Sequence, residues 1–565
     1  MTFDSTKKLK ELGYDIYYYK EPGIEPQVVN RRFSDFESFK NVEKNSLYIT
    51  EQKLYVHQYQ TYLKLSEGHN IILKSGTGSG KTEAWLLYAL EKHKKVLVIY
   101  PTLALANDQI RRLKEYSTYI GFKLEGIDAK RRSEAYKNGF TTSKLRNKLS
   151  EADILVTNPA FLLTDLKRWA SNSRSCVLIG FLPNIDLVVI DELDFYGPRE
   201  IALLISMLKI LRLITGKIFQ IAILTATLGN PKEMASILTE INTLPTSIID
   251  GKPFRVPNNV IIILGKNLRK IWNILRENEE LILSVPGIGN DVKDALEDFE
   301  VFRNNVYKIV QIARGLQISV PNIYIDPIEI LQRYLDDNGV TLVFTRSIAR
   351  AEELSRKLRM CLPEDERIKV ASHHHLISKE LRERIEAMAR TGEVKIVFSP
   401  RTLSQGIDIG TIIRIVHIGL PEDVREFHQR EGRKGRRKDI DFTESIIIPG
   451  SLWDRELLSR GVDVLKQWME LPLENVIVNK DNKYGKLLVA LFKFVSNKFS
   501  LEKDEVELLK ELGLIEGNLL SSRGKRTWHN INFYEFAPPF GIKRIKILNG
   551  KEKYLEDISF IDLVE

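Results

Sequence analysis

Two cysteines occur in the 565 residues, Cys176 and Cys361, and neither belongs to a CxxC pair or a cysteine and histidine cluster. This scarcity excludes a disulfide framework and a thiolate zinc site, and it favours a reducing compartment. The start of the chain also lacks the apolar core of a signal peptide. We therefore expect a cytoplasmic protein without a zinc site.

Long uninterrupted apolar runs are missing as well. The most apolar region, residues 201–228, contains Lys209, Arg212 and Lys217, so it predicts a buried helix and strand and no membrane span. The length exceeds that of one hydrophobic core and suggests several domains. A net charge of +9 favours a polyanionic partner such as nucleic acid without proving one.

Residues 71–83 read Ile-Ile-Leu-Lys-Ser-Gly-Thr-Gly-Ser-Gly-Lys-Thr-Glu, an apolar run that ends in three glycines before a helical pattern. Glycines let the backbone turn its amides inward as a phosphate cradle at the positive end of the helix. Lys81 adds charge for the outer phosphates, and the Thr82 hydroxyl can ligate magnesium. Ser75 stands where the strict fingerprint has glycine. The pattern predicts a nucleoside triphosphate site; the alternative is a glycine-rich turn without a ligand.

Short apolar runs alternate with helical patterns in two blocks, which predicts two α/β domains in series, each with a parallel sheet covered on both faces. The runs are residues 71–74, 96–100, 154–156, 187–190 and 221–224, then 341–345, 394–398, 412–418 and 446–448. Ligands of such domains bind where the strands end.

The remaining segments complete the predicted domain organisation. Residues 1–50 are an N-terminal extension packing on the first domain (51–250), and residues 251–335 are a mostly helical insertion before the second domain (336–465). Residues 466–565 form a small C-terminal winged-helix-like domain. Its tail carries eight Lys and Arg between Ser521 and Tyr554, with aromatics interleaved.

The strand predicted at residues 187–190 leads directly into Asp191-Glu192-Leu193-Asp194. Asp191 can hold magnesium, and Glu192 can orient or deprotonate the attacking water. An acidic surface turn is the alternative, but it fits poorly after a strand with no polar face.

A basic run, Gln-Arg-Glu-Gly-Arg-Lys-Gly-Arg-Arg, occupies residues 429–437. A solvated basic face is the default meaning of such a run. The glycine spacing favours a further role for Arg433 and Arg436, whose guanidinium groups can stabilise charge on a transferring phosphoryl group.

Taken in order, these motifs resemble those of superfamily 2 helicases over roughly residues 50–450. The resemblance implies two tandem RecA-like P-loop domains, and it is strongest to the Ski2-like, Lhr and Hrq/MrfA groups. Supporting matches are Pro-Thr-Leu-Ala-Leu-Ala-Asn-Asp-Gln at residues 101–109, Thr-Asn-Pro at 157–159 and Gly-Ile-Asp-Ile-Gly at 406–410. Asp194 replaces the histidine common in several of these groups. The Hrq/MrfA cysteine cluster is missing, which implies that its zinc domain is absent.

The resemblance implies ATP and Mg²⁺ as cofactors and assigns roles residue by residue. Glu192, Lys81, Arg433 and Arg436 are catalytic, the last two as arginine fingers, while Thr82 and Asp191 hold the metal. The nucleotide contacts are Gln58, which reads adenine, Gly76, Thr77, Gly78, Ser79, Gly80, Lys81, Thr82, Asp191, Gly406, Asp408 and Gln429.

Further motif positions imply nucleic-acid contacts at Pro101, Thr102, Gln109, Thr157, Asn158, Arg346 and His374, and at Thr402, because Pro400 occupies the usual threonine position. Coupling of hydrolysis to movement falls on Asp194, Thr225 and Thr227. A separate hypothesis is that Trp528 in the aromatic tail stacks on the strand; the alternative is that it belongs to the core of the small domain. The run His373-His374-His375 does not have metal-site spacing and fits structural or backbone-contacting roles.

The function implied is an ATP-dependent helicase or translocase that moves 3′ to 5′ on single-stranded or tailed DNA, in DNA repair or processing. An RNA helicase is one alternative. Another is a motor subunit of a nuclease or repair complex, since only a strand and a helix fit between Asp408 and Gln429, which leaves no room for a long strand-separating hairpin.

Overall fold

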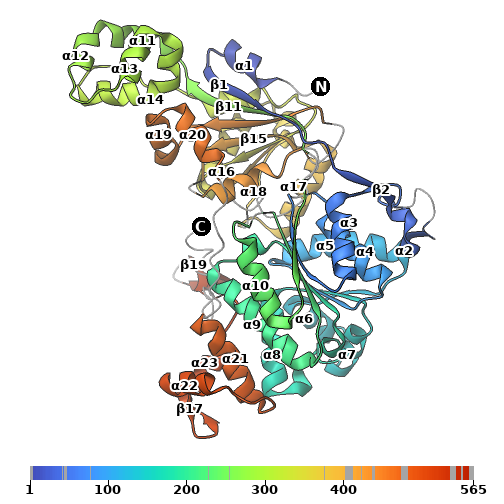
Figure 1. Ribbon diagram of the computed structural model, residues 1–565. Coiled ribbons are helices and arrows are strands. Elements are labelled where there is room, and N and C mark those ends of the chain that lie inside the picture. Colours follow the sequence, from blue (N-terminus) through green and yellow to red (C-terminus); the bar gives the residue numbers. More distant parts are fainter. Residues whose placement is uncertain are drawn as a thin grey trace. The chain divides into compact units, whose positions relative to one another are not determined.

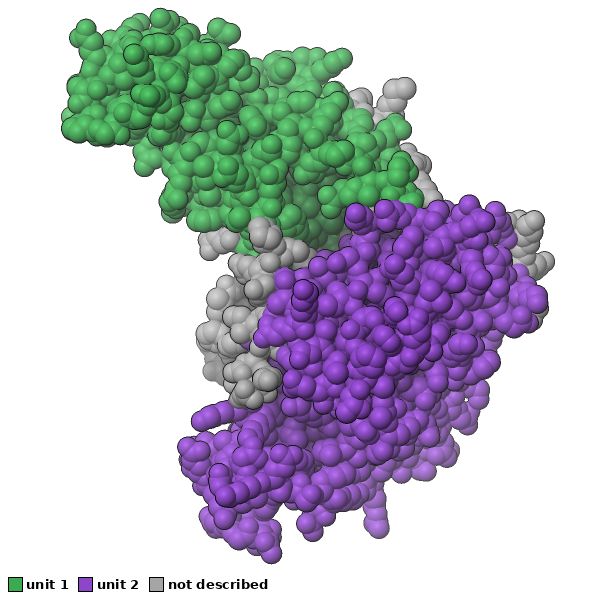
Figure 2. Space-filling view, in the orientation of Figure 1, with its two compact units in different colours: residues 1–26, 253–474 green, residues 27–252, 475–565 purple. Residues whose placement is uncertain are grey.

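The computed structural model describes residues 4–40, 42, 47–76, 78–226, 228–252, 255–374, 376–400, 412–421, 423–435, 440–471, 482–534, 542–548 and 551–558. The chain divides into two compact units, coloured separately in Figure 2. Unit 1 contains residues 1–26 and 253–474, and unit 2 contains residues 27–252 and 475–565. Each unit therefore combines segments that are far apart in the sequence.

The centre of unit 2 is a seven-stranded sheet in the order β10-β4-β9-β8-β5-β7-β6 (Figure 1). The strands are β4 (Asn70–Lys74), β5 (Val96–Ile99), β6 (Leu124–Gly126), β7 (Ile154–Thr157), β8 (Leu187–Ile190), β9 (Gln220–Thr225) and β10 (Thr246–Asp250). Every neighbouring pair is parallel. The predicted parallel α/β architecture of this region is confirmed.

Successive side chains of a strand point to opposite faces, and here both faces are covered. In β4, Ile71 and Leu73 join one apolar cluster and Ile72 joins the other. The first cluster contains residues of α4 (Lys81–Glu91) and α5 (Leu103–Ile120). The second contains residues of α7 (Thr142–Ser150), α8 (Pro159–Ser171), α9 (Pro198–Thr215) and α10 (Pro231–Asn242). Because the strands are parallel, the carboxyl ends of β4, β5, β7 and β8 lie at the same edge of the sheet.

The C-terminal helices α21 (Lys483–Ser496), α22 (Lys503–Glu511) and α23 (Ser522–Asn530) belong to the second of these clusters. Phe492 stacks on Trp169 of α8 with ring centroids 5.5 Å apart. A short hairpin, β17 (Ile515–Glu516) and β18 (Leu519–Leu520), precedes α23. These helices share a core with unit 2, which differs from the separate C-terminal domain expected from the sequence. The winged-helix character stays a prediction.

Unit 1 has a second seven-stranded sheet in the order β1-β11-β16-β15-β12-β14-β13. Its strands are β1 (Asp15–Glu21), β11 (Asn258–Gly265), β12 (Val340–Phe344), β13 (Val370–Ser372), β14 (Ile396–Ser399), β15 (Ile412–Ile418) and β16 (Thr443–Ile448). Only β1 is antiparallel to its neighbour. Helices α16 (Ile348–Met360), α17 (Lys379–Thr391) and α18 (Val424–Glu431) follow successive strands.

Two expectations for unit 1 were wrong. The N-terminal segment, residues 1–50, was expected to pack on the first domain; its part from residue 27 on does belong to unit 2, but β1 pairs with β11 in the second sheet. Residues 258–265 were assigned to a mostly helical insertion, yet they form the fully buried strand β11. The predicted helices follow it as α11 (Leu268–Glu277), α12 (Glu279–Leu283), α13 (Asn290–Glu297) and α14 (Phe299–Gly315).

The helices α11 to α14 bury their apolar faces together with α19 (Leu452–Ser459) and α20 (Val462–Met469) in one cluster. The remaining described elements are α1 (Ser5–Glu11), α2 (Glu37–Lys40), α3 (Val56–Ser66), α6 (Ala129–Lys137), α15 (Pro327–Gln332), five 3₁₀ turns and the pairs β2 (Val28–Arg32) with β3 (Lys53–Tyr55) and β19 (Ile542–Leu548) with β20 (Lys551–Ile558). Across the described residues, we find no helix with the length and apolarity needed to cross a membrane.

Candidate active site

The predicted phosphate loop joins the end of β4 to the start of α4. Gly78 and Gly80 have φ angles of 77° and 76°, the left-handed region that glycine adopts most easily. A Cβ on Gly80 would lie 2.3 Å from Nε2 of Gln58, so a side chain would collide as well. The glycines of this loop are therefore required by its backbone. Thr77 lies outside the described residues.

The start of α3 holds this loop in place. His57 Nε2 lies 2.8 Å from the carbonyl oxygen of Ser79, and Gln58 Nε2 donates to the carbonyl oxygen of Gly80 at 3.0 Å. Gln58 Oε1 also accepts from the amide of Tyr55 at 2.9 Å, and the side chain is buried. The amide thus positions the phosphate loop, and the adenine-reading role of Gln58 stays a prediction. His57, which the sequence reasoning missed, lies beside it in the chain.

Lys81 and Ser79 carry the clearest sign of a ligand. Both are buried, and neither the Lys81 Nζ nor the Ser79 Oγ makes a hydrogen bond within the described chain. The nearest charge to Lys81 is Glu192, with Nζ and Oε1 3.6 Å apart. Burial lowers the pKa of Lys81, but Glu192 and two further acids outweigh it, so its pKa is raised and the ammonium stays charged. Buried donors without acceptors cost free energy, which phosphate oxygens would recover.

The acids follow β8 at the same edge of the sheet. Asp191 is buried, and its Oδ1 accepts from the amide of Glu192 at 2.8 Å. Glu192 has φ 50° and ψ 54°, a left-handed conformation that is strained for a residue with a side chain. Burial, and then the charge of Glu192, raise the pKa of Asp191 to about 7.

This arrangement fits a divalent cation. Asp191, Glu192 and Asp194 all act electrostatically on Lys81, so three acids face this one lysine. Asp191 and Thr82 supply the oxygen ligands that Mg²⁺ prefers, and such sites are usually completed by phosphate oxygens and water.

Gln109 lies at this site too, which corrects its predicted role. It was expected to contact nucleic acid, but the Thr82 Oγ1 donates to its Oε1 at 3.2 Å. Gln109 is seven positions after Thr102, which corresponds to about 10 Å along a helix axis. Thr102 therefore lies at the start of α5 while Gln109 lies two turns deeper, beside the phosphate loop.

Two of the predicted coupling residues are in direct contact. Thr225, at the end of β9, donates its Oγ1 to Asp194 Oδ1 at 2.9 Å, and both side chains are buried. This bond joins the acidic motif to the Thr-Ala-Thr motif. Thr227 lies outside the described residues.

Several residues predicted to contact nucleic acid lie together at the ends of β5 and β7. Thr102 and Asn158 cap the starts of α5 and α8 with their side-chain oxygens and, with Pro101, line one pocket. Thr157 does not join them: it is 2% exposed, and its Oγ1 donates to the carbonyl oxygen of Ile127 at 2.9 Å. Its hydroxyl is used to join β7 to the loop after β6.

Trp528 takes the packing role rather than an exposed stacking one. Its ring is 8% exposed and belongs to the core of unit 2. The indole Nε1 donates to Ser171 Oγ at 2.9 Å, at the end of α8. The alternative in which this aromatic is part of a core therefore matches the structure.

In unit 1, Arg346 is exposed just after β12, whereas Arg433 is buried just after α18 and Gln429 lies on that helix. His374 is also buried, and its Nε2 lies 2.6 Å from Glu352 Oε1, so its ring holds α16 and does not present itself to a strand. Thr402, Gly406, Asp408 and Arg436 lie outside the described residues.

The site and sheet of unit 2 define a P-loop nucleoside triphosphatase, with lysine and threonine after one parallel strand and the acid pair after another. Residues 55–234 match the DEAD/DEAH box helicase model, and residues 326–438 match the helicase conserved C-terminal domain. The chain belongs to the superfamily 2 helicases, and the predicted pair of RecA-like domains is confirmed.

Relatives and solved structures agree with this family. Over 517 residues the chain is 26% identical to the uncharacterized ATP-dependent helicase MJ1574 of Methanocaldococcus jannaschii. The matched region covers 87% of this chain and 65% of that protein. It is 26% identical to the ATP-dependent helicase HRQ1 of Saccharomyces cerevisiae over 410 residues, 69% of this chain and 32% of that one. The chain thus spans at most about two thirds of the length of these relatives.

Among solved structures, the DUF1998 helicase MrfA bound to DNA is similar with a TM-score of 0.70 and 18% identity, over 99% of this chain and 68% of that one. The Mycobacterium smegmatis helicase Lhr bound to ssDNA and AMP-PNP is similar with a TM-score of 0.53 and 18% identity, over 80% and 53% of the two chains. At this identity the likeness shows the fold.

Proposed function

We propose that this chain uses ATP hydrolysis to move along, and to separate, nucleic acid strands. The observation that carries the proposal is the buried Lys81 without a hydrogen-bond acceptor in the described chain, set beside the acid pair Asp191 and Glu192. Such a site is built for a metal-bound polyphosphate, and the family to which the chain belongs couples it to strand movement.

Each residue of the site has one task in this proposal. Lys81 neutralises charge on the outer phosphates, and Asp191 and Thr82 would hold Mg²⁺, which would supply further neutralisation of the phosphate charge. Glu192 lies 3.6 Å from Lys81 and orients or deprotonates the attacking water. Gln109 and Gln58 keep Thr82 and Gly80 in position.

Arg433 and Arg436 complete the site from unit 1 in this proposal, as arginine fingers. Hydrolysis then requires the two units to close, and phosphate release allows them to open. The bond between Asp194 and Thr225 is placed to pass a change at the acid pair to the end of β9. A strand held mostly through phosphate contacts would be moved by one cycle of closing and opening, and its binding would weaken with salt.

DNA is the substrate we propose, with movement from 3′ to 5′ in DNA repair or processing. Support comes from the likeness to MrfA bound to DNA and to Lhr bound to ssDNA. RNA is the competing substrate, and we propose a cytoplasmic place of action for either.

A second candidate is a translocating motor subunit that serves a nuclease or repair partner and unwinds poorly. One observation favours it: β15 ends at Ile418 and α18 begins at Val424, so no long hairpin stands between them. Such a motor would hydrolyse ATP on a strand at full rate while separating a duplex slowly.

The test compares Lys81→Ala and Glu192→Gln with the wild type on matched DNA and RNA duplexes that carry 3′ or 5′ single-stranded tails. We expect both variants to lose strand-stimulated ATP hydrolysis by about 100-fold or more, while strand binding without nucleotide is kept. Lys92→Ala is the matched control, because Lys92 is exposed just after the helix that Lys81 begins. Turnover by either site variant at the wild-type rate would contradict the assigned roles.

The same panel separates the candidates. Unwinding only with a 3′ DNA tail supports the proposed polarity and substrate, whereas stronger stimulation by RNA would select the RNA alternative. Full ATP hydrolysis with little unwinding on every duplex would select the motor subunit.

A further inference from the structure

A pocket of about 720 Å³ opens in unit 2 at the edge where β5 and β7 end, a volume suited to a bound small molecule or a nucleotide unit. Its walls come from the start of α5, from one side each of α6 and α8, from Phe195 after the acidic motif, and from Tyr534 near the C-terminal end of the described core. The residues that the argument uses are Thr102, Arg132, Tyr136, Asn158, Arg168 and Tyr534.

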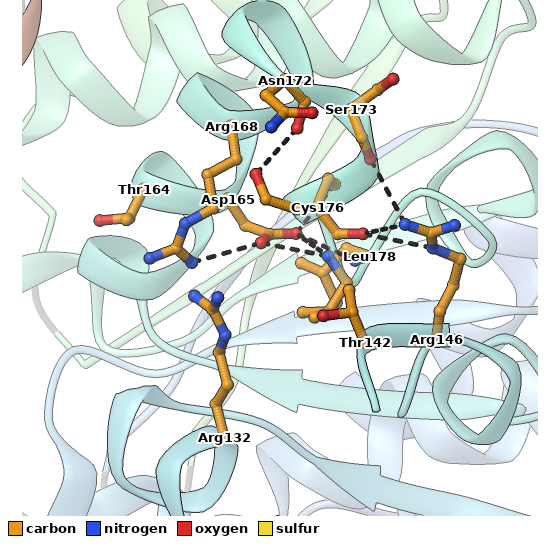
Figure 3. A network of polar contacts seen from close by, with 12 residues as sticks. Arg132, Thr142, Arg146, Thr164, Asp165, Arg168, Asn172, Ser173, Cys176 and Leu178 are labelled. Atoms are coloured by element: carbon orange, nitrogen blue, oxygen red, sulfur yellow. Dashed lines mark hydrogen bonds and ion pairs between the residues drawn. The ribbon is translucent and has the colours of Figure 1, made fainter. Parts of the chain in front are cut away.

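The charge in this pocket is positive. Arg132 of α6 and Arg168 of α8 line it, and Figure 3 shows their guanidinium groups pointing toward one another. Among the described residues that line it there is no carboxylate. Asp165 lies behind Arg168, 3.6 Å from its Nη1, but this acid is fully buried and accepts mainly from backbone amides.

Tyr136 lies in the positive electrostatic field of these arginines. Its ring lies under Arg132, 5.3 Å from the guanidinium carbon, and its hydroxyl accepts from Arg132 Nε at 3.1 Å. Burial raises the pKa of this hydroxyl, but hydrogen bonds from Thr142 and Arg132 and the charges of Arg132 and Arg168 outweigh it, so the pKa is lowered. A group with negative charge is therefore favoured at this point.

The rest of the pocket is aromatic and firmly held. Tyr136, Phe161, Phe195 and Tyr534 converge on it from four segments. The Tyr534 hydroxyl donates to the carbonyl oxygen of Pro101 at 2.6 Å, and its ring packs edge to face on Phe533. Aromatic surfaces that are already ordered bind a flat ring at a low entropic cost.

We propose that this pocket receives one unstacked base of a bound single strand, with a neighbouring phosphate between Arg132 and Arg168. The proposal rests on the proposed function, because it places a subsite of the same strand that Thr102 and Asn158 would contact at the rim. Guanidinium groups bind phosphate, and every base has a π-face that can stack on an aromatic ring. The required ligand is thus a nucleotide within a strand.

The first experiment uses the full chain and DNA duplexes with a 20-nucleotide thymidine 3′ tail, whose junction sets the binding register. The tail carries a single 2-aminopurine, moved one position at a time, and duplexes with a uridine RNA tail form a second arm. We expect the emission of 2-aminopurine to change at one or two positions only. Tyr136→Leu should remove that change and weaken binding by roughly 5- to 150-fold, the loss typical of one stacked base. Tyr136→Phe keeps the ring but loses the hydroxyl that accepts from Arg132 Nε, so it should keep the emission change.

The second experiment measures the salt dependence of strand binding. Arg132→Gln and Arg168→Gln should each lower the slope of log affinity against log salt by about 0.7, the value for one phosphate contact on a single strand. Arg174→Gln is the matched control, since Arg174 is exposed in the same unit and does not line the pocket. Circular dichroism and a melting curve establish that each variant is folded.

A wild-type chain that binds strands with the same emission at every position would overturn the base pocket, and unchanged slopes in both arginine variants would overturn the phosphate contact. These results would leave ATP hydrolysis intact, so the proposed function would stand. A wild-type chain that neither binds strands nor shows stimulated hydrolysis would instead refute the proposed function and, with it, this subsite.

Discussion

Asp165→Asn is the substitution from which the structure predicts the clearest loss of stability. The Asp165 carboxylate is fully buried in α8 and accepts from the amides of Val177 and Leu178 at 3.1 and 2.9 Å. It also accepts from the Cys176 thiol at 3.0 Å and pairs with Arg168 at 3.6 Å (Figure 3). This one side chain thus fixes residues 176–178 against α8 and anchors an arginine of the pocket.

An asparagine of the same shape keeps one oxygen, which can still accept from the backbone amides. Its amide nitrogen then faces the Arg168 guanidinium, which also donates. Two backbone bonds change from charge-assisted to neutral, which costs about 1 kcal/mol each. The lost pairing with Arg168 adds about 1 kcal/mol, a modest figure because this arginine is 31% exposed. The total of about 3 kcal/mol should lower the unfolding temperature of unit 2 by roughly 6 °C.

Differential scanning calorimetry of the full chain measures this change, because two compact units allow two transitions. The matched control is Asp153→Asn: Asp153 is exposed and accepts from the amide of Lys123 at 2.8 Å, and water can replace its carboxylate. The control should stay within about 1 °C of the wild type. If Asp165→Asn does so too, the carboxylate is not the anchor that we describe.

Three further predictions concern the nucleotide site and the thiols. Burial and Glu192 raise the pKa of Asp191 to about 7, and only the carboxylate form binds a metal. Mg²⁺-dependent ATP binding should therefore strengthen roughly tenfold from pH 6 to pH 8. Titration calorimetry measures this, and a flat pH profile would contradict it. Gln109→Leu removes the acceptor of the Thr82 hydroxyl and should weaken Mg·ATP binding about threefold, while strand binding without nucleotide stays unchanged. If Gln109 contacted the strand instead, strand binding would weaken and Mg·ATP binding would not. Burial and the charge of Asp165 raise the pKa of the Cys176 thiol, so iodoacetamide at pH 8 should label the folded chain once, at the exposed Cys361, and twice after denaturation; two labels in the folded state would refute this.

Strands buried on both faces were predictable because their sequences are continuous apolar runs. Residues 187–190 are one example, and the structure places them at the centre of a parallel sheet. β1 was missed because it carries three consecutive tyrosines, of which Tyr17 and Tyr19 pack on an apolar cluster while Tyr18 is exposed, so its sequence shows no clear alternation. β11 was missed because it follows β10 without a helix between them, since the chain passes there from one sheet to the other.

The parts of the nucleotide site that are contiguous in the chain could be predicted from the sequence. Lys81 with Thr82 and Asp191 with Glu192 are adjacent pairs whose local patterns indicate their chemistry. The pocket beyond them had no such signal. Arg132, Tyr136 and Arg168 are single residues on two helices, and Tyr534 comes from more than 360 positions later in the chain, so only the shared core of α8 with α21 to α23 brings them together.

Helix α5 gives unit 2 a direct connection between its two proposed ligand sites. Thr102 caps its first turn at the pocket, and Gln109, two turns further, accepts from the Thr82 hydroxyl. The helix is held at its middle because Glu83 of α4 accepts from Tyr116 at 2.8 Å and pairs with Arg112. Helix α5 therefore contacts both proposed ligand sites of unit 2 and is anchored between them. We therefore expect part of the coupling between nucleotide and strand to run through α5 within unit 2, and Gln109→Leu tests it by removing the contact with Thr82.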